Sequence, residues 1–281
     1  MILVADSGSS KCDWAFFESE NNKIKIIKTI GFNPYFLSSE KIINELKKSV
    51  DLCKISKIVK TIFFYGSGCS DILKKKSINK TLSLFFTEAD IYTEHDLLGA
   101  CRSIYDNKNS INCILGTGSI SCIYDGKQVD LTNPSLGYIL GDEGSGSYFG
   151  KKVLNLYFNN KLTKDLRKDL EHNYNVSYQD VMTKVYNNDR SNYFLASFFP
   201  FLIKHRKKPI FFDILKNGVL CFLKIHVFSI PKFQTYKINF FGSVSLSLKD
   251  LIIQELNKKK CVTGVFENKP ILGLFKYHYK K

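Results

Sequence analysis

One short pattern occurs twice in the sequence, and this repeat limits the folds that the chain can adopt. Each copy is an apolar run, a turn of glycine and hydroxyl residues, and a second apolar run. The first copy has its turn at 6–10, between the runs 2–5 and 14–17, and the second has its turn at 116–119. Two apolar runs around such a turn predict a β-hairpin. Two hairpins, each followed by helices and a further strand, predict two related α/β lobes.

The segments after each hairpin have the patterns typical of an α/β protein. Apolar residues at helical spacing predict helices in five segments: 39–52, 96–105, 151–187, 194–222 and 248–256. Short apolar runs predict further strands: 24–30, 60–65, 91–93 and 237–241. The chain from Pro270 onward predicts a last short helix, and no Pro-rich or Ser-rich linker separates the two halves.

Length and composition exclude several classes of protein. The 281 residues suffice for two compact domains, and 44% hydrophobic with 24% charged residues is typical of a soluble globular protein. The longest apolar stretch, 193–203, is too short to cross a bilayer, and Asp6 interrupts any signal-peptide pattern. We therefore expect a cytoplasmic protein without a membrane partner. Eight scattered cysteines with no C-x-x-C pair predict free thiols.

The net charge of +15 raises the question of nucleic-acid binding. Only four of the 41 basic residues are arginine, whereas proteins that read nucleic acid favour arginine for its planar fork. We interpret the lysines as a solvated surface and expect no specific nucleic-acid partner.

The two turns have the composition of phosphate-binding loops. Small residues let backbone N–H groups converge on an anion, and Asp6 at the end of the first strand could hold Mg²⁺ through water. An ordinary hairpin is the alternative for one such turn alone. Two turns at corresponding places favour a nucleotide polyphosphate, although neither is a Walker-type loop.

Two acidic segments complete the candidate residues. Asp142 and Glu143 are adjacent carboxylates among glycines, before a predicted helix, and Asp96 stands between a predicted strand and a predicted helix. Helix capping is the alternative for all three residues.

Six motifs occur in a recognisable order and spacing: 6–14 (DSGSSKCDW), 31–34 (GFNP), 94–98 (EHDLL), 113–119 (CILGTGS), 136–146 (LGYILGDEGSG) and 242–244 (GSV). Together they resemble the N-acetylglucosamine kinase branch of the BadF/BadG/BcrA/BcrD ATPases, in the actin-like and sugar-kinase superfamily. The closing 273–278 (GLFKYH) also fits, so the resemblance covers essentially the whole chain.

The resemblance implies two ribonuclease-H-like lobes of the actin-like ATPase fold, with a nucleotide and sugar cleft between them. The first lobe would be 1–110, with the C-terminal helix 268–281 packing back on it, and the second would be 111–267. The implied activity is ATP-dependent phosphorylation of the 6-hydroxyl of N-acetylglucosamine or a close amino sugar, in the salvage of amino sugars or cell-wall sugars. ATP and Mg²⁺ are the implied cofactors.

The resemblance also implies a role for each motif residue. Asp96 would be the catalytic base. Residues for the ATP phosphates and adenosine would be Asp6 (also for the metal), Gly8, Ser9, Ser10, Lys11, Gly116, Thr117, Gly118, Ser119, Gly242 and Ser243. Residues for the sugar would be Asn33, Asp96, Thr117, Asp142 and Glu143.

The chain departs from the family pattern at three positions. Ile120 stands where asparagine is expected, Cys12 where threonine is expected, and His95 where a small residue is expected. Two other functions stay open: a non-enzymatic sugar sensor, and an activator ATPase of a radical dehydratase. The activator would need cysteines near the first helix of the second lobe, and none follows Glu143 before Cys221. The sequence leaves a homodimer and the identity of the amino sugar open.

Overall fold

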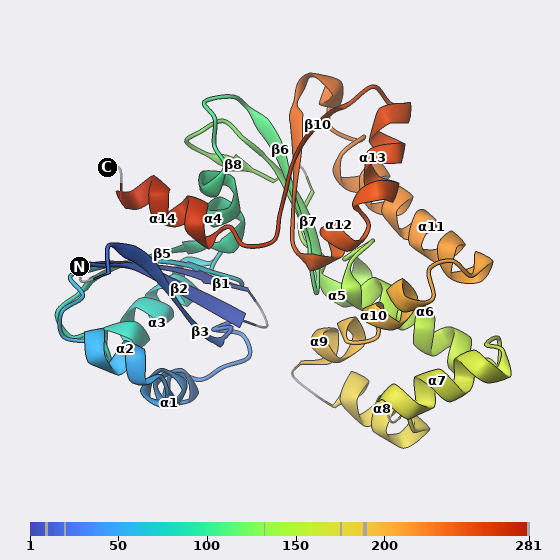
Figure 1. Ribbon diagram of the computed structural model, residues 1–281, viewed down its shortest axis with the longest axis horizontal. Helices are drawn as coiled ribbons and strands as arrows, with labels where there is room; N and C mark the ends of the chain where they lie inside the picture. Colours follow the sequence, from blue (N-terminus) through green and yellow to red (C-terminus); the bar gives the residue numbers. More distant parts are fainter. Residues whose placement is uncertain (9–10, 20, 132, 175, 188–189, 280–281) are drawn as a thin grey trace. The chain divides into compact units, whose positions relative to one another are not determined.

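A computed structural model gives the structure of residues 1–8, 11–19, 21–131, 133–174, 176–187 and 190–279 (Figure 1). Ser9 and Ser10 of the first predicted phosphate turn lie outside the described residues. The chain forms two compact units. Unit 1 comprises Met1–Lys108 and Lys269–Lys281, and unit 2 comprises Asn109–Asn268.

Unit 1 contains a five-stranded sheet with the order β3-β2-β1-β4-β5. The strands are β1 (Ile2–Ser7), β2 (Lys11–Glu18), β3 (Lys23–Ile30), β4 (Thr61–Gly66) and β5 (Asp90–His95). The helices are α1 (Ser39–Lys48), α2 (Val50–Ile55), α3 (Ile72–Ser83), α4 (Asp96–Ser103) and α14 (Ile271–Tyr279). Strand β2 is antiparallel to both of its neighbours, whereas β1, β4 and β5 are parallel to one another.

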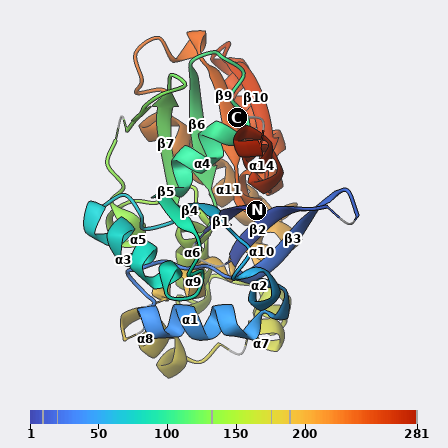
Figure 2. The ribbon, with the colours of Figure 1, turned by 90° about the vertical axis from the view of Figure 1, so that its left-hand side faces the viewer.

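Helices cover both faces of this sheet, as Figures 1 and 2 show. Helices α1, α2 and α3 lie on one face, where Trp14 is fully buried and its ring centroid lies 5.9 Å from those of Phe32 and Phe64. Helices α4 and α14 lie on the other face, where the ring of His278 stacks on Phe63. Because successive strand residues point to opposite faces, the apolar positions of β1 and β2 supply both cores.

Unit 2 repeats this sheet with the order β10-β9-β6-β7-β8. The strands are β6 (Ser110–Leu115), β7 (Ser119–Tyr124), β8 (Val129–Asp130), β9 (Lys237–Phe241) and β10 (Val262–Glu267). In both units the first strand is central, antiparallel to the second and parallel to the fourth. The predicted pair of related α/β lobes is therefore confirmed.

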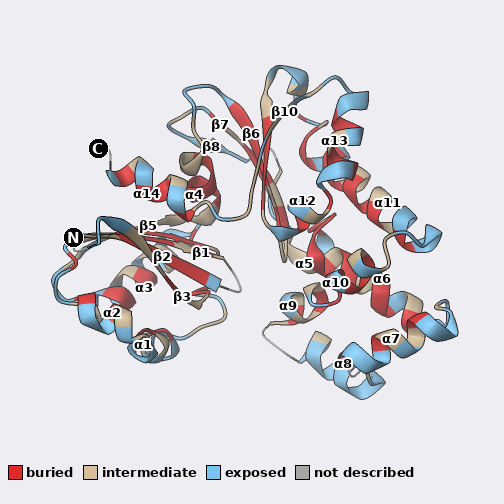
Figure 3. Cartoon of the chain, viewed as in Figure 1, coloured by how far each residue is buried: buried red, intermediate tan, exposed pale blue. Residues whose placement is uncertain are grey.

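Unit 2 also has a larger set of helices: α5 (Gly137–Leu140), α6 (Gly146–Phe158), α7 (Lys164–Tyr174), α8 (Tyr178–Tyr186), α9 (Ser191–Ala196), α10 (Phe199–Lys204), α11 (Pro209–His226), α12 (Ser243–Ser247) and α13 (Lys249–Lys258). Phenylalanines of α6, α10 and α11 form much of its core, which Figure 3 shows as buried. None of the helices in the described part of the chain has the length and apolarity needed to cross a membrane.

Several predicted boundaries were wrong. The helix predicted over 39–52 is two helices, because the Ser49 side chain accepts a hydrogen bond from the Leu52 N–H (3.3 Å) and starts a new helix. The segment 151–187 is divided among α6, α7 and α8. Helix α3 and strand β10 were not predicted. A run of three lysines begins at Lys74 and obscures the apolar spacing of α3, and β10 mixes exposed and half-buried residues.

Candidate functional site

Carboxylates gather at one end of the unit 1 sheet. Asp6 is the penultimate residue of β1 and pairs directly with Asp13 of β2, and Asp96 begins α4 immediately after β5. Burial raises the pKa of Asp6 to about 7, and the negative charges of Asp96 and Asp13 add to this rise. Burial also raises the pKa of Asp96 to about 6. The fold therefore holds at least two acids that titrate close to neutral pH.

Asp96 does not cap its helix, so the capping alternative was wrong. His95 occupies the cap position, and its Nδ1 accepts a hydrogen bond from the Leu98 N–H at 3.1 Å. Asp96 is the first helical residue, and its Oδ1 accepts a hydrogen bond from the Leu97 N–H at 2.9 Å. That bond orients the carboxylate but leaves capping to the imidazole. His95, one of the three departures from the family pattern, thus has a structural role in this chain.

The acidic end of the sheet fits Mg²⁺ that keeps most of its water. Within the described residues, no three histidine, cysteine, aspartate or glutamate side chains come together as a ligand set. Mg²⁺ usually binds through one or two carboxylates and retains several waters. Asp6 supplies such a carboxylate, and a cation beside it would offset the repulsion between Asp6, Asp13 and Asp96. Asp13 was not predicted as a site residue, although an aspartate inside the apolar run of β2 was the available signal.

The side chain of Asn33, which also belongs to unit 1, is held by close contacts with the backbone at Tyr35 and Gly68. Its side chain is buried, and its Oδ1 accepts a hydrogen bond from the Tyr35 N–H at 2.9 Å. Gly68 has φ +80°, and a Cβ there would lie 2.5 Å from the Asn33 Oδ1. In the described part of the chain the amide nitrogen of Asn33 has no acceptor, which leaves a donor for a ligand.

The described part of the first turn leaves free space beside Gly8 and Lys11, two of its predicted phosphate-binding residues. A Cβ on Gly8 would meet only the carbonyl oxygen of Lys11, at an ordinary 3.8 Å. The Lys11 side chain is exposed, and its ammonium group lies 3.8 Å from the Asp13 carboxylate. Both residues are therefore accessible to an anion.

The second turn, 116–119, offers free backbone donors in unit 2. Within the described residues the N–H groups of Thr117 and Gly118 have no hydrogen-bond acceptor. A Cβ on Gly116 would meet nothing within 4 Å, so the chain itself does not require glycine there. Unoccupied space beside free N–H groups is what a bound phosphate needs.

The same turn is bonded to the acidic segment that precedes α6. The Ser119 N–H donates to the Asp142 Oδ1 at 2.9 Å, and the Ser119 hydroxyl donates to the Glu143 carbonyl at 2.7 Å. Gly118 is required here, because a Cβ would lie 2.9 Å from both oxygens of the Asp142 carboxylate. In the sequence, the turn 116–119 and the segment with Asp142 and Glu143 are separate motifs. In the structure, these hydrogen bonds join them into one site.

The first turn of α6 is already satisfied by the protein. The N–H groups of Gly146 and Ser147 donate to the carbonyls of Gly116 (2.8 Å) and Thr117 (3.1 Å). The Ser145 hydroxyl accepts from the Tyr148 N–H, so Ser145, rather than Asp142 or Glu143, caps this helix. The capping alternative for the two acids was therefore wrong, and neither carboxylate is engaged by the first turn of α6.

The two residues predicted to approach the adenosine, Gly242 and Ser243, have different roles in the fold. Gly242 has φ +97°, and a Cβ there would lie 2.4 Å from the Leu115 carbonyl oxygen, so packing alone requires this glycine. Ser243 is exposed at the start of α12 and could contact a ligand.

Ile120, which stands in place of the expected asparagine, is half-buried and pairs with Ile114 in the sheet.

His226 is a candidate that the sequence analysis missed. It lies at the end of α11, and its Nε2 is 3.7 Å from the Glu143 Oε2. A histidine at the end of an apolar helix gave no signal, since the contact joins residues far apart in the chain.

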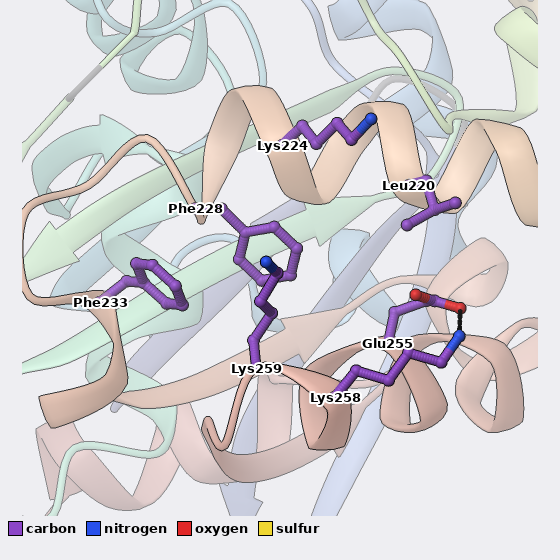
Figure 4. A pocket seen from close by; sticks show the side chains of 7 residues that line it. All are labelled: Leu220, Lys224, Phe228, Phe233, Glu255, Lys258 and Lys259. Carbon is purple, nitrogen blue, oxygen red and sulfur yellow. Dashed lines mark hydrogen bonds and ion pairs between the residues drawn. The ribbon is translucent and has the colours of Figure 1, made fainter.

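A separate pocket of about 310 Å³ lies elsewhere in unit 2 (Figure 4). Residues from α11, α13 and the segment between them line it, and none of the predicted site residues is among them. Its buried acid, Glu255, is paired with Lys258 at 2.6 Å. We do not assign a function to this pocket.

No family model and no curated protein matches the chain. Among solved structures, the chain is similar to a proposed N-acetylglucosamine kinase of Porphyromonas gingivalis, with 30% identity over 100% of this chain and 99% of that chain and a TM-score of 0.90. The chain belongs to the family of this protein. Its placement in the BadF-type branch stays a prediction.

More distant members of the fold share the architecture of the family. A proposed N-acetylglucosamine kinase of Chromobacterium violaceum is 14% identical, with 98% of both chains covered and a TM-score of 0.70. A ROK-family glucokinase of Streptomyces griseus, in complex with glucose and AMPPNP, is 12% identical over 99% of this chain and 100% of that chain, with a TM-score of 0.57. These similarities show the two-lobed fold of actin-like ATPases and sugar kinases.

Two glycine variants separate ligand binding from folding in unit 2. We expect Gly116→Ala to leave the melting temperature near that of the wild type, because its Cβ enters empty space. If this space holds phosphate, the KM for ATP should rise roughly tenfold, which corresponds to about 1.4 kcal/mol of lost binding. Gly242→Ala should instead destabilise the fold by roughly 1–3 kcal/mol, since it adds a clash at a positive φ. Thermal unfolding and ATP titration of both variants check this, and an unchanged KM in Gly116→Ala would contradict the phosphate assignment.

Proposed function

We propose that the protein is an ATP- and Mg²⁺-dependent kinase that phosphorylates the 6-hydroxyl of N-acetylglucosamine or a close amino sugar. The observation that carries the proposal is the full-length similarity, at 30% identity, to the P. gingivalis protein described as a proposed N-acetylglucosamine kinase. The chemistry of the candidate residues in each unit supports it.

In this proposal the two turns bind the ATP phosphates. The free N–H groups of Thr117 and Gly118, with the space beside Gly116, hold one part of the polyphosphate. Gly8 of the first turn supplies a further close backbone approach, and Lys11 supplies a positive charge. Ser9 and Ser10 remain predicted phosphate ligands of the same turn. Ser243 contacts the adenosine, whereas Gly242 shapes the backbone. Phosphoryl transfer depends mainly on positioning and charge neutralisation, and these groups provide both.

Asp96 acts as the general base of the reaction. A sugar hydroxyl becomes a competent nucleophile when a carboxylate takes its proton as the new bond to phosphorus forms. The raised pKa of Asp96, about 6, leaves it ionised at neutral pH and makes it a better proton acceptor than an ordinary aspartate. Its hydrogen bond from the Leu97 N–H keeps the carboxylate oriented for this role.

Asp6 holds Mg²⁺ through water in the same proposal. When bound, the cation neutralises charge on the phosphates of ATP. The carboxylate of Asp6 must be ionised for this, and its pKa of about 7 means that protons compete with the cation near neutral pH.

Four polar groups orient the sugar. Asn33 offers its free amide N–H₂, and Thr117 offers a hydroxyl. One oxygen of Asp142 already accepts from the Ser119 N–H, so its second oxygen remains for the sugar, and Glu143 is the less engaged of the two acids. A cytoplasmic location and the absence of a specific nucleic-acid partner stay predictions from the sequence.

The substrate is tested with a panel of sugars. With ATP and Mg²⁺, we expect N-acetylglucosamine to be phosphorylated at its 6-hydroxyl with a higher kcat/KM than glucose, because the polar set suits a substituted hexose. N-acetylmuramic acid, N-acetylmannosamine and glucosamine complete the panel. Coupled assays and NMR of the product identify the acceptor oxygen. Equal turnover of glucose, or phosphate on the anomeric oxygen, would contradict the proposal.

Asp96→Asn tests the base. Asparagine keeps the oxygen that accepts from the Leu97 N–H but cannot take a proton, so we expect kcat to fall roughly 10²-fold or more with nucleotide affinity nearly unchanged. Asp71→Asn is a matched control, because Asp71 also bonds backbone N–H groups at the start of a helix, α3. The control should keep both kcat and melting temperature. Normal turnover in Asp96→Asn would show that another residue is the base.

Asp96 and Asp6 should affect different kinetic quantities, each in its own pH range. At saturating Mg²⁺, kcat should decline below about pH 6, because Asp96 must be deprotonated to act and its pKa is raised to about 6. The Mg²⁺ concentration needed for half-maximal rate should rise as the pH falls through about 7, where Asp6 takes up a proton. In Asp96→Asn the residual kcat should lose its decline near pH 6. The change in Mg²⁺ requirement should remain but move to lower pH, because the charge of Asp96 no longer raises the pKa of Asp6. A profile identical to that of the wild type would exclude Asp96 as the titrating group.

A further inference from the structure

His226 is a buried polar side chain whose ring nitrogens lack hydrogen-bond partners in the described part of the chain, and this destabilises the fold. The residue is 5% exposed, and neither ring nitrogen has a hydrogen-bond partner among the described residues. Burial lowers the pKa of His226, so the ring is neutral near pH 7. A buried polar group without a partner opposes folding, and an apolar residue of similar size would avoid that penalty.

The other buried or half-buried histidines of the described chain do have partners. The Nε2 of His278 and the hydroxyl of Tyr65 are 2.7 Å apart and hydrogen-bonded. The Nε2 of His205 lies 2.6 Å from the Asp169 carboxylate, and the Nδ1 of His95 accepts from a backbone N–H. His226 is therefore unusual among the histidines of the described chain.

The surroundings of His226 point to the acidic segment of the candidate sugar site. Gly218, Phe222 and His226 are spaced four residues apart on α11 and share one face of the helix. Gly144 packs directly on that face, because a Cβ on it would lie 2.9 Å from both the Gly218 carbonyl and the Phe222 Cβ. The His226 ring stacks on Phe222, with centroids 4.9 Å apart. This face of α11 therefore holds the imidazole of His226 beside the segment that carries Glu143.

The distance between His226 and Glu143 is slightly longer than a hydrogen bond. The Nε2 lies 3.7 Å from the Glu143 Oε2, and the Glu143 side chain is 22% exposed. A shift of roughly half an ångström by the partly exposed carboxylate would form an N–H···O⁻ bond of ordinary length. The fixed imidazole and the adjustable carboxylate are therefore arranged for a contact that forms when Glu143 is drawn into place.

We propose that His226 is a positioning residue for the sugar: its Nε2–H donates to the Glu143 carboxylate when an amino sugar binds, and so orients that carboxylate to accept hydrogen bonds from the sugar hydroxyls. This inference rests on the proposed function of the site. His226 itself is too deeply buried to contact the sugar, so it acts through Glu143.

The test is His226→Leu, which removes both ring nitrogens and keeps a similar volume. The melting temperature should be equal to or above that of the wild type, because the variant no longer buries unpaired polar atoms. The KM for N-acetylglucosamine should rise roughly tenfold, while the KM for ATP stays within about twofold, since only sugar binding loses a hydrogen-bonded carboxylate. His226→Gln retains an N–H donor and should recover part of the sugar affinity. An unchanged sugar KM in His226→Leu would overturn the proposal.

Two further variants separate positioning from packing. His205→Leu removes a partnered histidine in the same unit, so it should lower the melting temperature and leave the sugar KM unchanged. In a double-mutant cycle, His226→Leu should have little further effect on sugar KM once Glu143→Gln is present. Additive effects of the two substitutions, or an equal rise in both KM values with a lower melting temperature, would show that His226 acts only through packing.

Calorimetric titration of the wild type with N-acetylglucosamine distinguishes failure of this inference from failure of the proposed function. If the wild type binds and phosphorylates the sugar and His226→Leu binds it equally well, only the positioning role is wrong. If the wild type neither binds nor phosphorylates any sugar in the panel, the proposed function is wrong and this inference falls with it.

Discussion

The hydrogen bond from the Ser119 N–H to the Asp142 carboxylate is the interaction on which the unit 2 site depends. It ties the turn between β6 and β7 to the segment before α6, and it explains two otherwise costly features. Asp142 has φ +56°, which is uncommon for a residue with a side chain, and Gly118 admits no Cβ because the carboxylate lies against it. With this bond in place, the carbonyls of the turn accept the first N–H groups of α6, and the N–H groups of Thr117 and Gly118 remain free. The free donors are thus a consequence of how the turn is anchored.

Features that depend on near neighbours in the chain were predictable from the sequence. The hairpins follow from apolar runs around small-residue turns, and the repeat of that pattern led to two lobes with the same strand order. The positions of Asp6 and Asp96 at strand ends followed from the same local patterns. What local patterns could not distinguish was the precise helix start, because His95 and Asp96 are both able to bond backbone N–H groups.

Features that depend on distant contacts were not predictable. The approach of His226 to Glu143 joins the end of α11 to the turn before α6, and nothing near either residue in the sequence indicates it. The need for glycine at position 68 comes from the Asn33 side chain, which belongs to another loop. Asp13 was visible as an acid in an apolar strand, but its significance comes from Asp6 on the neighbouring strand. In each case the sequence contains the residue, and only the fold supplies its partner.

Both units retain groups that oppose folding, and the two cases have a common physical explanation. In unit 1, burial and mutual repulsion raise the pKa of Asp6 to about 7, and each unit of pKa shift corresponds to about 1.4 kcal/mol. In unit 2, His226 buries two unpaired nitrogens. A cation beside Asp6 would offset the repulsion there, and the Glu143 carboxylate drawn against His226 would pair one of its two nitrogens. A ligand that brings about either change binds more tightly for that reason. Apolar or paired residues at these two places would stabilise the fold, as such replacements commonly do. In our proposal, the ligands that complete the two groups account for their presence.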